Sequence, residues 1–180
     1  KYEKRKPPYG FKLFEFGVEA RMPSIIFKRD FIDKIGGFDT RFKLTAADSE
    51  LVQRALLQGT VVFVPRIISC YRVWRGALTS QKQATKQWID EIELWTRKIS
   101  DLAENSFLET ELSFNRNLYC DEVKARNIVA GAIQLYKKGE LKEVLNFINK
   151  IGVPKHSTLK SKIKLLLLMQ ISKIKTIFME

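Results

Sequence analysis

The chain has 180 residues, of which 45% are hydrophobic and 29% charged, and its formal net charge is +12. The length suits one domain, or one domain with an appendage, and the hydrophobic content excludes an intrinsically disordered chain. The positive charge predicts attraction to a phosphate-bearing partner, such as nucleic acid, anionic lipid or a sugar nucleotide. Cys70 and Cys120 lack metal-site spacing and favour a reducing compartment. No stretch of about 20 uncharged apolar residues occurs, so we expect no membrane span.

The first elements are short. Lys1–Pro8 is basic and contains two prolines, which predicts an irregular segment. Tyr9–Phe16 is rich in aromatic residues that alternate, which favours a strand or an extended loop, and Pro23–Phe27 is a second short candidate strand. Lys28–Ile35 is predicted to be a helix that ends at Gly36, because glycine takes the left-handed C-cap conformation at little cost.

A second helix is expected after the polar loop that follows Gly37. Asp48 and Ser49 are good N-cap candidates for it, and Gly59 would end it. Arg54 lies four residues after Glu50, at the spacing of an intrahelical ion pair. Two β-branched and aromatic runs then predict strands, at Thr60–Pro65 and Ile67–Val73.

From Gln81 onward the sequence has almost no strand signal. Trp88, Ile92 and Trp95 recur at helical spacing and predict a helix over residues 81–100. Four further helical segments are predicted, at Phe107–Leu118, Asp121–Lys138, Glu140–Asn149 and Leu159–Phe178. We therefore expect an α/β region with short strands over residues 1–80, followed by a mostly α-helical region over residues 81–180.

Residues 36–59 contain a set of motif residues whose order and spacing are distinctive. It consists of the Gly36-Gly37-Phe38-Asp39 turn, then Asp48 at a helix start, then Arg54 and Gly59. This set resembles the second, acceptor-side half of the family 2 glycosyltransferases with the GT-A fold. The resemblance covers residues 20–80, about the part that precedes the helical region.

Further along, Val61–Ser80 is similar to the two strands and the turn that follow in that family. Two positions depart from the family pattern. Ala47 stands where many members have glutamate, and Met22 stands where close relatives have histidine.

The resemblance implies an inverting transfer from a nucleotide-sugar donor to a glycan or lipid-linked acceptor, in bacterial cell-surface polysaccharide synthesis. The donor-binding half, with an Asp-x-Asp motif for Mn²⁺ or Mg²⁺, would precede Met22, yet no aspartate occurs before Asp30. We therefore expect a fragment of a longer enzyme that is inactive alone, with most metal ligands outside this chain. The expected location is cytoplasmic, with attachment to the inner face of the membrane as an open alternative.

The resemblance also assigns roles to residues. It places the catalytic base at Asp48, whereas an N-cap aspartate is the structural alternative. Asp39 could accept hydrogen bonds from acceptor hydroxyls or could cap its own turn. Gly37 could let a ligand approach the backbone closely or could serve the turn alone.

Arg72 and Arg75 flank Trp74 in the last part of the family-like region. A guanidinium near a leaving diphosphate would stabilise its charge, and the indole could stack on a sugar ring. The alternative is a solvated arginine pair beside a buried tryptophan. His156 is the sole histidine and has no cysteine or carboxylate at ligand spacing, so we expect no metal site in this chain.

Two other functions stay open. The basic residues are spread along the chain and form no recognisable nucleic-acid module, so a specific nucleic-acid partner is not expected. A helical interaction module could be formed by residues 121–150. The segment Lys150–Glu180 contains seven lysines and one acidic residue, which leaves either docking on an anionic membrane surface or packing on the chain's own helices.

Overall fold

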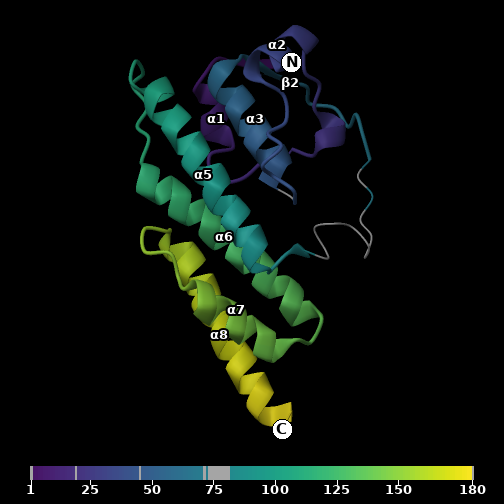
Figure 1. Cartoon of the computed structure of the whole chain (residues 1–180), viewed down its shortest axis with the longest axis vertical. Helices are drawn as coiled ribbons and strands as arrows, with labels where there is room; N and C mark the ends of the chain where they lie inside the picture. Colours follow the sequence, from purple (N-terminus) through teal and green to yellow (C-terminus); the bar gives the residue numbers. More distant parts are fainter. Residues whose placement is uncertain (1, 19, 45, 71, 73–81, 180) are drawn as a thin grey trace.

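A computed structural model describes residues 2–18, 20–44, 46–70, 72 and 82–179. The short elements gather at one end of the molecule, and the long helices extend to the other end (Figure 1). In chain order the elements are β1 (Glu3–Arg5), α1 (Tyr9–Leu13), the 3-10 helix η1 (Met22–Ser24), α2 (Arg29–Ile35), α3 (Ala46–Gln58), β2 (Val61–Phe63), α5 (Lys86–Phe107), α6 (Arg116–Lys137), α7 (Leu141–Ile151) and α8 (Leu159–Met179).

Among the described residues there is one small sheet, which has two strands. Strand β1 pairs with β2 in antiparallel fashion, with Glu3 opposite Phe63 and Arg5 opposite Val61. The strand predicted at Thr60–Pro65 is therefore confirmed in its central residues. Met22–Ser24 is a 3-10 helix instead of the start of a strand, and the extended residues 25–28 have no strand partner among the described residues.

The predicted strand at Ile67–Val73 is also absent over residues 67–70 and 72, and its other positions lie outside the described residues. Isolated extended segments cannot form a ladder, because backbone N–H and C=O groups need a neighbouring strand. The predicted α/β architecture is thus confirmed only in its helical part.

The prediction for Tyr9–Phe16 was wrong, because the segment begins with helix α1. Phe11 on this helix is fully buried, and its ring lies 5.9–6.3 Å from the rings of Phe107, Phe114 and Tyr119. This aromatic cluster joins α1 to α5 and α6. Tertiary packing therefore outweighs the local alternation that favoured a strand.

The ends of α2 and α3 show how the double-glycine turn is built. Helix α2 ends at Gly36, which has a φ of +87°, and Gly37 follows with a φ of +59°. The predicted C-cap is thereby confirmed. Helix α3 begins at Ala46, two residues before the predicted start, because Ala46 and Ala47 are strong helix formers.

The long helices start earlier or end later than predicted. Thr85 caps α5 by accepting a hydrogen bond from the Trp88 N–H at 3.2 Å. Asn115 caps α6 in the same way, with the Leu118 N–H at 2.9 Å. The predicted helix at Phe107–Leu118 was wrong, because residues 108–115 form the turn that leads to this cap.

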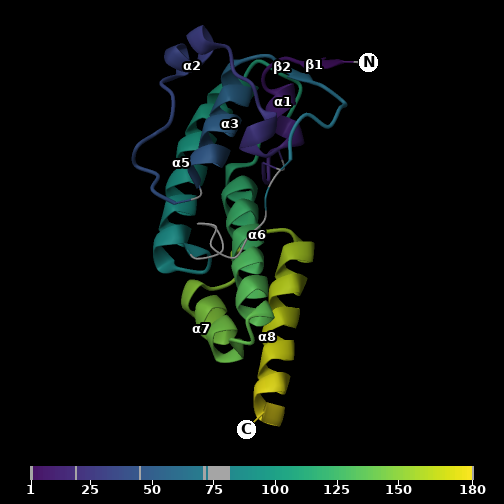
Figure 2. The same ribbon diagram turned by 90° about the vertical axis from the view of Figure 1, so that its right-hand side faces the viewer.

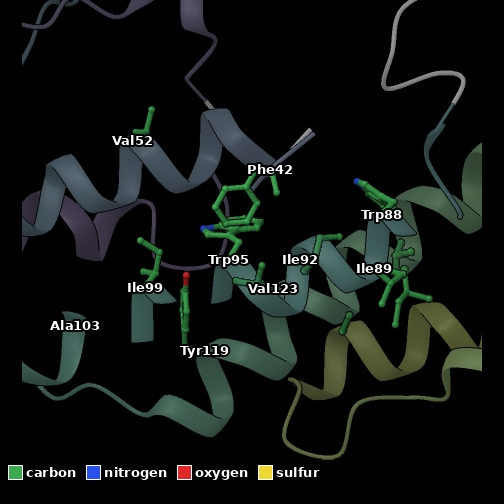
Figure 3. Packing of buried hydrophobic residues seen from close by; sticks show 14 of the residues in the cluster. Phe42, Val52, Trp88, Ile89, Ile92, Trp95, Ile99, Ala103, Tyr119 and Val123 are labelled. Atoms are coloured by element: carbon green, nitrogen blue, oxygen red, sulfur yellow. The ribbon is translucent and has the colours of Figure 1, made fainter. Parts of the chain in front are cut away.

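One continuous hydrophobic core runs through the described part of the chain. It includes buried side chains from α1, α3, α5 and α6, several of which are shown in Figure 3, and it reaches Leu165 on α8. Helix α3 packs on α5, α5 on α6, and α6 on both α7 and α8. Figure 2 shows α8 alongside α6 at the edge of the bundle, with its last turns extending beyond the other helices.

Gln53 links four of these elements in the core. Its side chain is fully buried and donates to the carbonyl oxygens of Phe14 and Glu15 at 2.7 and 3.1 Å. Its carbonyl oxygen accepts from Trp95 Nε1 at 3.0 Å and from the Tyr119 hydroxyl at 2.6 Å. Every donor and acceptor site of this amide is used, which fixes the segment after α1 and helices α3, α5 and α6 relative to one another.

Candidate functional site

Asp48 is the third residue of α3 and its side chain is exposed. The carboxylate makes no hydrogen bond or ion pair with the residues that the structure describes. Neighbouring atoms still remove part of its hydration, and this partial desolvation raises the pKa of Asp48 above its ordinary value. Because α3 begins two residues earlier, Asp48 is not the N-cap, and its carboxylate is available to accept a proton.

Asp39 has the opposite environment. It follows the double-glycine turn, and its carboxylate accepts hydrogen bonds from the Arg41 backbone N–H at 3.0 Å and the Arg41 guanidinium at 2.6 Å. Lys98 on α5 donates to the same carboxylate at 2.7 Å. The bond from Arg41 is the main cause that holds the pKa of Asp39 far below its ordinary value, against the effect of burial and with further help from Lys98.

Glu50 and Arg54 form a buried ion pair on the inner face of α3. Arg54 Nε lies 2.6 Å from one Glu50 oxygen, and Nη2 lies 3.0 Å from the other. Lys98 lies 2.8 Å from Glu50 and thereby connects Glu50 to Asp39. The ion pair predicted from the spacing of Glu50 and Arg54 is confirmed.

Arg54 also holds the double-glycine turn. Its guanidinium donates to the carbonyl oxygens of Ile35 and Gly37, the latter at 2.5 Å. A Cβ added at Gly36 or Gly37 would meet no other atom within 4 Å, so these glycines are needed for their positive φ and not for space. The turn is therefore held from one side by α3 and is open on the other.

An open hollow of about 440 Å³ lies between the turn and helices α3 and α5. Its walls are formed by Ile35, Gly36, Asp39, Arg54, Gln58, Lys98, Asp101 and Leu102. Asp48 does not line this hollow. The structure thus brings Asp39 and the glycine turn together with Arg54 and Lys98, and it leaves Asp48 as a separate carboxylate at the start of the same helix.

Glu91 positions the loop before α3 and was not singled out from the sequence. Its buried carboxylate accepts hydrogen bonds from the backbone N–H groups of Lys43 at 2.7 Å and Leu44 at 3.0 Å. The neighbouring Phe42 belongs to the same buried hydrophobic cluster as Trp95 of α5 (Figure 3). Glu91 lies three residues after Trp88, so a carboxylate on the apolar face of a helix was the available signal.

Among the other predicted residues, Arg72 and His156 are described, and neither takes part in the contacts given above. Arg72 is exposed, whereas Trp74 and Arg75 lie outside the residues that the structure describes. The backbone N–H of His156 donates to Asp121 at 2.6 Å, and its side chain is exposed. The described residues contain no cluster of three or more His, Cys, Asp or Glu side chains suited to a metal ion.

Comparisons with known protein families, with curated proteins and with solved structures found no match to this chain. The order of residues between Met22 and Gly59 and the geometry of their side chains therefore carry the functional argument.

Proposed function

We propose that this chain forms the acceptor side of a sugar-nucleotide-dependent, inverting glycosyltransferase, with Asp48 as the general base. The observation that carries the proposal is the contrast among the three acids near α3. Asp39 and Glu50 each pair with cationic side chains, whereas Asp48 makes no hydrogen bond or ion pair with the described residues, and partial desolvation raises its pKa. A base needs a free lone pair, and of these three acids only Asp48 makes no hydrogen bond or ion pair with the described residues.

In the proposed reaction, the acceptor hydroxyl loses its proton to the Asp48 carboxylate while its oxygen attacks the anomeric carbon of the donor sugar. A new C–O bond forms, and the bond from the anomeric carbon to the nucleoside diphosphate breaks with inversion. The Asp48 carboxyl group is then neutral, the negative charge leaves with the nucleoside diphosphate, and the carboxyl group later loses its proton to solvent. The Glu91 carboxylate, which holds the preceding loop through Lys43 and Leu44, keeps the base in place.

Exposed apolar side chains near the small sheet also support the proposal. Ile26 and Ile67 are 91% and 96% exposed, and each lies on a segment that has no strand partner among the described residues. Large apolar side chains on unpaired extended segments are typical of surfaces that another part of an assembly covers. A donor-binding half with its own sheet would supply such a cover.

The roles proposed here all belong to the chain's own side chains. A divalent metal, where the enzyme uses one, would be held by the donor-binding half and would neutralise the leaving diphosphate. Sugar nucleotides are accordingly expected to bind the isolated chain no tighter than about 1 mM. A micromolar heat signal on titration with UDP-, GDP- or dTDP-sugars would contradict this division of roles.

The test of the base is Asp48→Asn in an enzyme that contains the donor-binding half. Release of nucleoside diphosphate in the presence of acceptor should fall by about 10²–10⁴-fold, the usual effect of removing a general base. The matched control is Asp30→Asn. It changes an exposed acid on a different helix, α2, and should leave turnover unchanged. Retention of more than about a third of the turnover in Asp48→Asn would exclude the proposed role.

A further inference from the structure

The outer face of α8 carries a row of exposed apolar side chains that is interrupted by the exposed Gln170. Their exposed fractions lie between 42% and 85%, which is unusual for so many large residues on one helix. We call them the α8 outer face: Leu159, Ile163, Leu166, Leu167, Ile171, Ile174, Ile177 and Phe178.

The helical period places these residues on one side. At about 100° per residue they fall within an arc of about 140°, along a helix about 30 Å long. Ser161, Leu165 and Ser172 lie on the opposite side and are buried against the rest of the bundle. Figure 2 shows α8 at the edge of the molecule, so its outer face is not covered by another described element.

Lysines border the α8 outer face on both edges. Lys164 lies just beyond one edge, with Lys160 inside the arc near that edge, and Lys162 and Lys173 lie just beyond the other edge. Lys160, Lys164 and Lys173 make no hydrogen bond or ion pair with the described residues. No acidic residue occurs anywhere from Leu159 to Met179, so this edge charge is not neutralised within the helix.

We propose that the α8 outer face docks on an anionic lipid surface. An exposed apolar arc bordered by lysines matches a helix that lies in the interface plane, with its apolar side chains among the acyl chains. The lysine stems extend along the apolar boundary and place their ammonium groups among the lipid phosphates. No helix among the described residues is long and apolar enough to cross a bilayer, which fits attachment to one surface only.

A second copy of the chain is a poorer occupant of the same face. A two-fold contact between two α8 outer faces would bring the lysines of one copy against those of the other, since both edges are basic. Lipid phosphates instead supply the opposite charge along both edges. The charge pattern therefore selects an anionic surface over self-association.

Helix α8 is also held in place before any contact with lipid. The buried Glu122 carboxylate on α6 accepts hydrogen bonds from the Thr158 N–H at 2.8 Å and the Ser161 hydroxyl at 2.9 Å, at the start of α8. Lys175 lies over the Tyr136 ring near the other end, 4.8 Å from its centroid. A preformed helix does not lose the ordering entropy that a disordered tail would lose on docking.

The experiment is co-sedimentation of the full chain with phosphatidylcholine vesicles, with and without phosphatidylglycerol. Wild type should sediment with the anionic vesicles, less at high salt, and little with the neutral ones. Leu167→Gln/Ile174→Gln and Lys164→Glu/Lys173→Glu should each weaken binding by about tenfold or more. These four side chains are exposed, so the variants should keep the wild-type circular dichroism spectrum.

Two matched controls use the other end of the molecule. Val62→Gln/Ile68→Gln changes two apolar side chains of similar exposure, 53% and 52%, and Lys28→Glu/Lys34→Glu makes the same change of charge. Both control variants should bind like wild type.

Three outcomes would overturn the proposal. Wild type could fail to bind anionic vesicles, or the controls and the α8 variants could lose binding equally. Sedimentation velocity could also show a dimer that the Leu167→Gln/Ile174→Gln change dissociates. The α8 outer face shares no residue with the Asp48 site, so lipid binding and sugar transfer can fail separately.

Discussion

Around α3, charged side chains point inward and contact one another, whereas along α8 they point outward and leave the apolar face between them bare. Glu50, Arg54 and Lys98 form a chain of short contacts that ends on Asp39 and on the backbone of the glycine turn. Lys160, Lys164 and Lys173 have no such partners among the described residues. Paired inner charges fix the backbone, and unpaired outer charges are available to an external partner.

Asp48 is unpaired, like these lysines of α8, although it lies on α3 beside the paired charges. It is two residues from Glu50, and residues at that separation on a helix point about 200° apart. One carboxylate therefore faces the buried network while the other faces solvent. The same helix thus carries a structural acid and a chemically available acid.

Breaking the inner network should give the largest loss of stability. Arg54→Met keeps much of the side-chain volume but leaves Glu50 buried with Lys98 alone and frees the carbonyl of Gly37. Removal of one partner from a buried pair typically costs about 3–5 kcal/mol. The free energy of unfolding from urea denaturation checks this value. Arg29→Met is the control, because the Arg29–Asp33 pair is exposed and should contribute under about 1 kcal/mol.

A second buried polar group, the uncharged side-chain amide of Gln53, also joins the helices through hydrogen bonds. Gln53→Leu should cost about 2–4 kcal/mol, because it leaves the indole N–H of Trp95 and the hydroxyl of Tyr119 without their partner. Urea denaturation again measures the change. Gln87→Leu alters an exposed glutamine on α5 and should be almost neutral, and equal stability of the two variants would show that Gln53 does not join the helices.

Glu122 connects the helical bundle to the start of α8 and adds a dependence on pH. Burial opposes its charge, but hydrogen bonds from Arg126, Thr158 and Ser161 together hold the pKa of Glu122 below its ordinary value of 4.5. Its stabilising contribution is therefore fully present above the unfolded pKa and is lost as the pH falls through the folded pKa. Glu122→Gln should cost about 1.5–3 kcal/mol at neutral pH through weaker hydrogen bonds.

Thermal unfolding at about pH 7 and about pH 3 checks the sign of this effect. The difference between wild type and Glu122→Gln should shrink at the lower pH, because the contribution of the charged carboxylate falls once the pH is below the unfolded pKa. A gap that grows in acid would mean that Glu122 is not stabilised as an anion.

The smallest effect is expected at Ser172, on the inner side of α8. Its hydroxyl is the one buried side-chain polar atom without a hydrogen-bond partner among the described residues. Ser172→Ala should leave the free energy of unfolding unchanged or raise it slightly, within about 0.5 kcal/mol. A loss of more than about 1 kcal/mol would show that the hydroxyl has a partner in solution, which would change the account of how α8 packs.

The sequence predicted the parts of the fold that local patterns determine. The glycine end of α2, the Glu50–Arg54 pair and the presence of helices α5, α6, α7 and α8 follow from spacing, capping and periodicity, whereas the helix predicted at Phe107–Leu118 does not exist. The helix at Tyr9–Leu13 did not, because the contacts of Phe11 with Phe107 and Tyr119 join residues about a hundred positions apart. The strand predictions that included residues 25–27 and 67–70 were wrong for a related reason. A strand needs a partner strand, and a local sequence pattern does not show whether one is present.

The candidate site shows the same division. The pattern of glycines and acids singled out Asp39 and Asp48, and the resemblance suggested a role for each, but neither separated the two carboxylates by their contacts. The separation comes from Lys98 on α5 and Arg41 beside the turn, which contact Asp39 and not Asp48. The Arg41 contact is local, but the Lys98 contact depends on the packing of α5 against α3, which no spacing within residues 36–59 encodes.

A side-chain carboxyl titration followed by ¹³C NMR tests the central contrast most directly. The ordinary pKa of an aspartate is 3.8, and the account predicts that Asp48 titrates above this value and Asp39 well below it in the same spectra. Arg41→Met should raise the pKa of Asp39 and leave that of Asp48 unchanged. If Asp48 instead titrates at or below Asp39, then Asp48 is a paired anion like its neighbours, and the proposed base is contradicted.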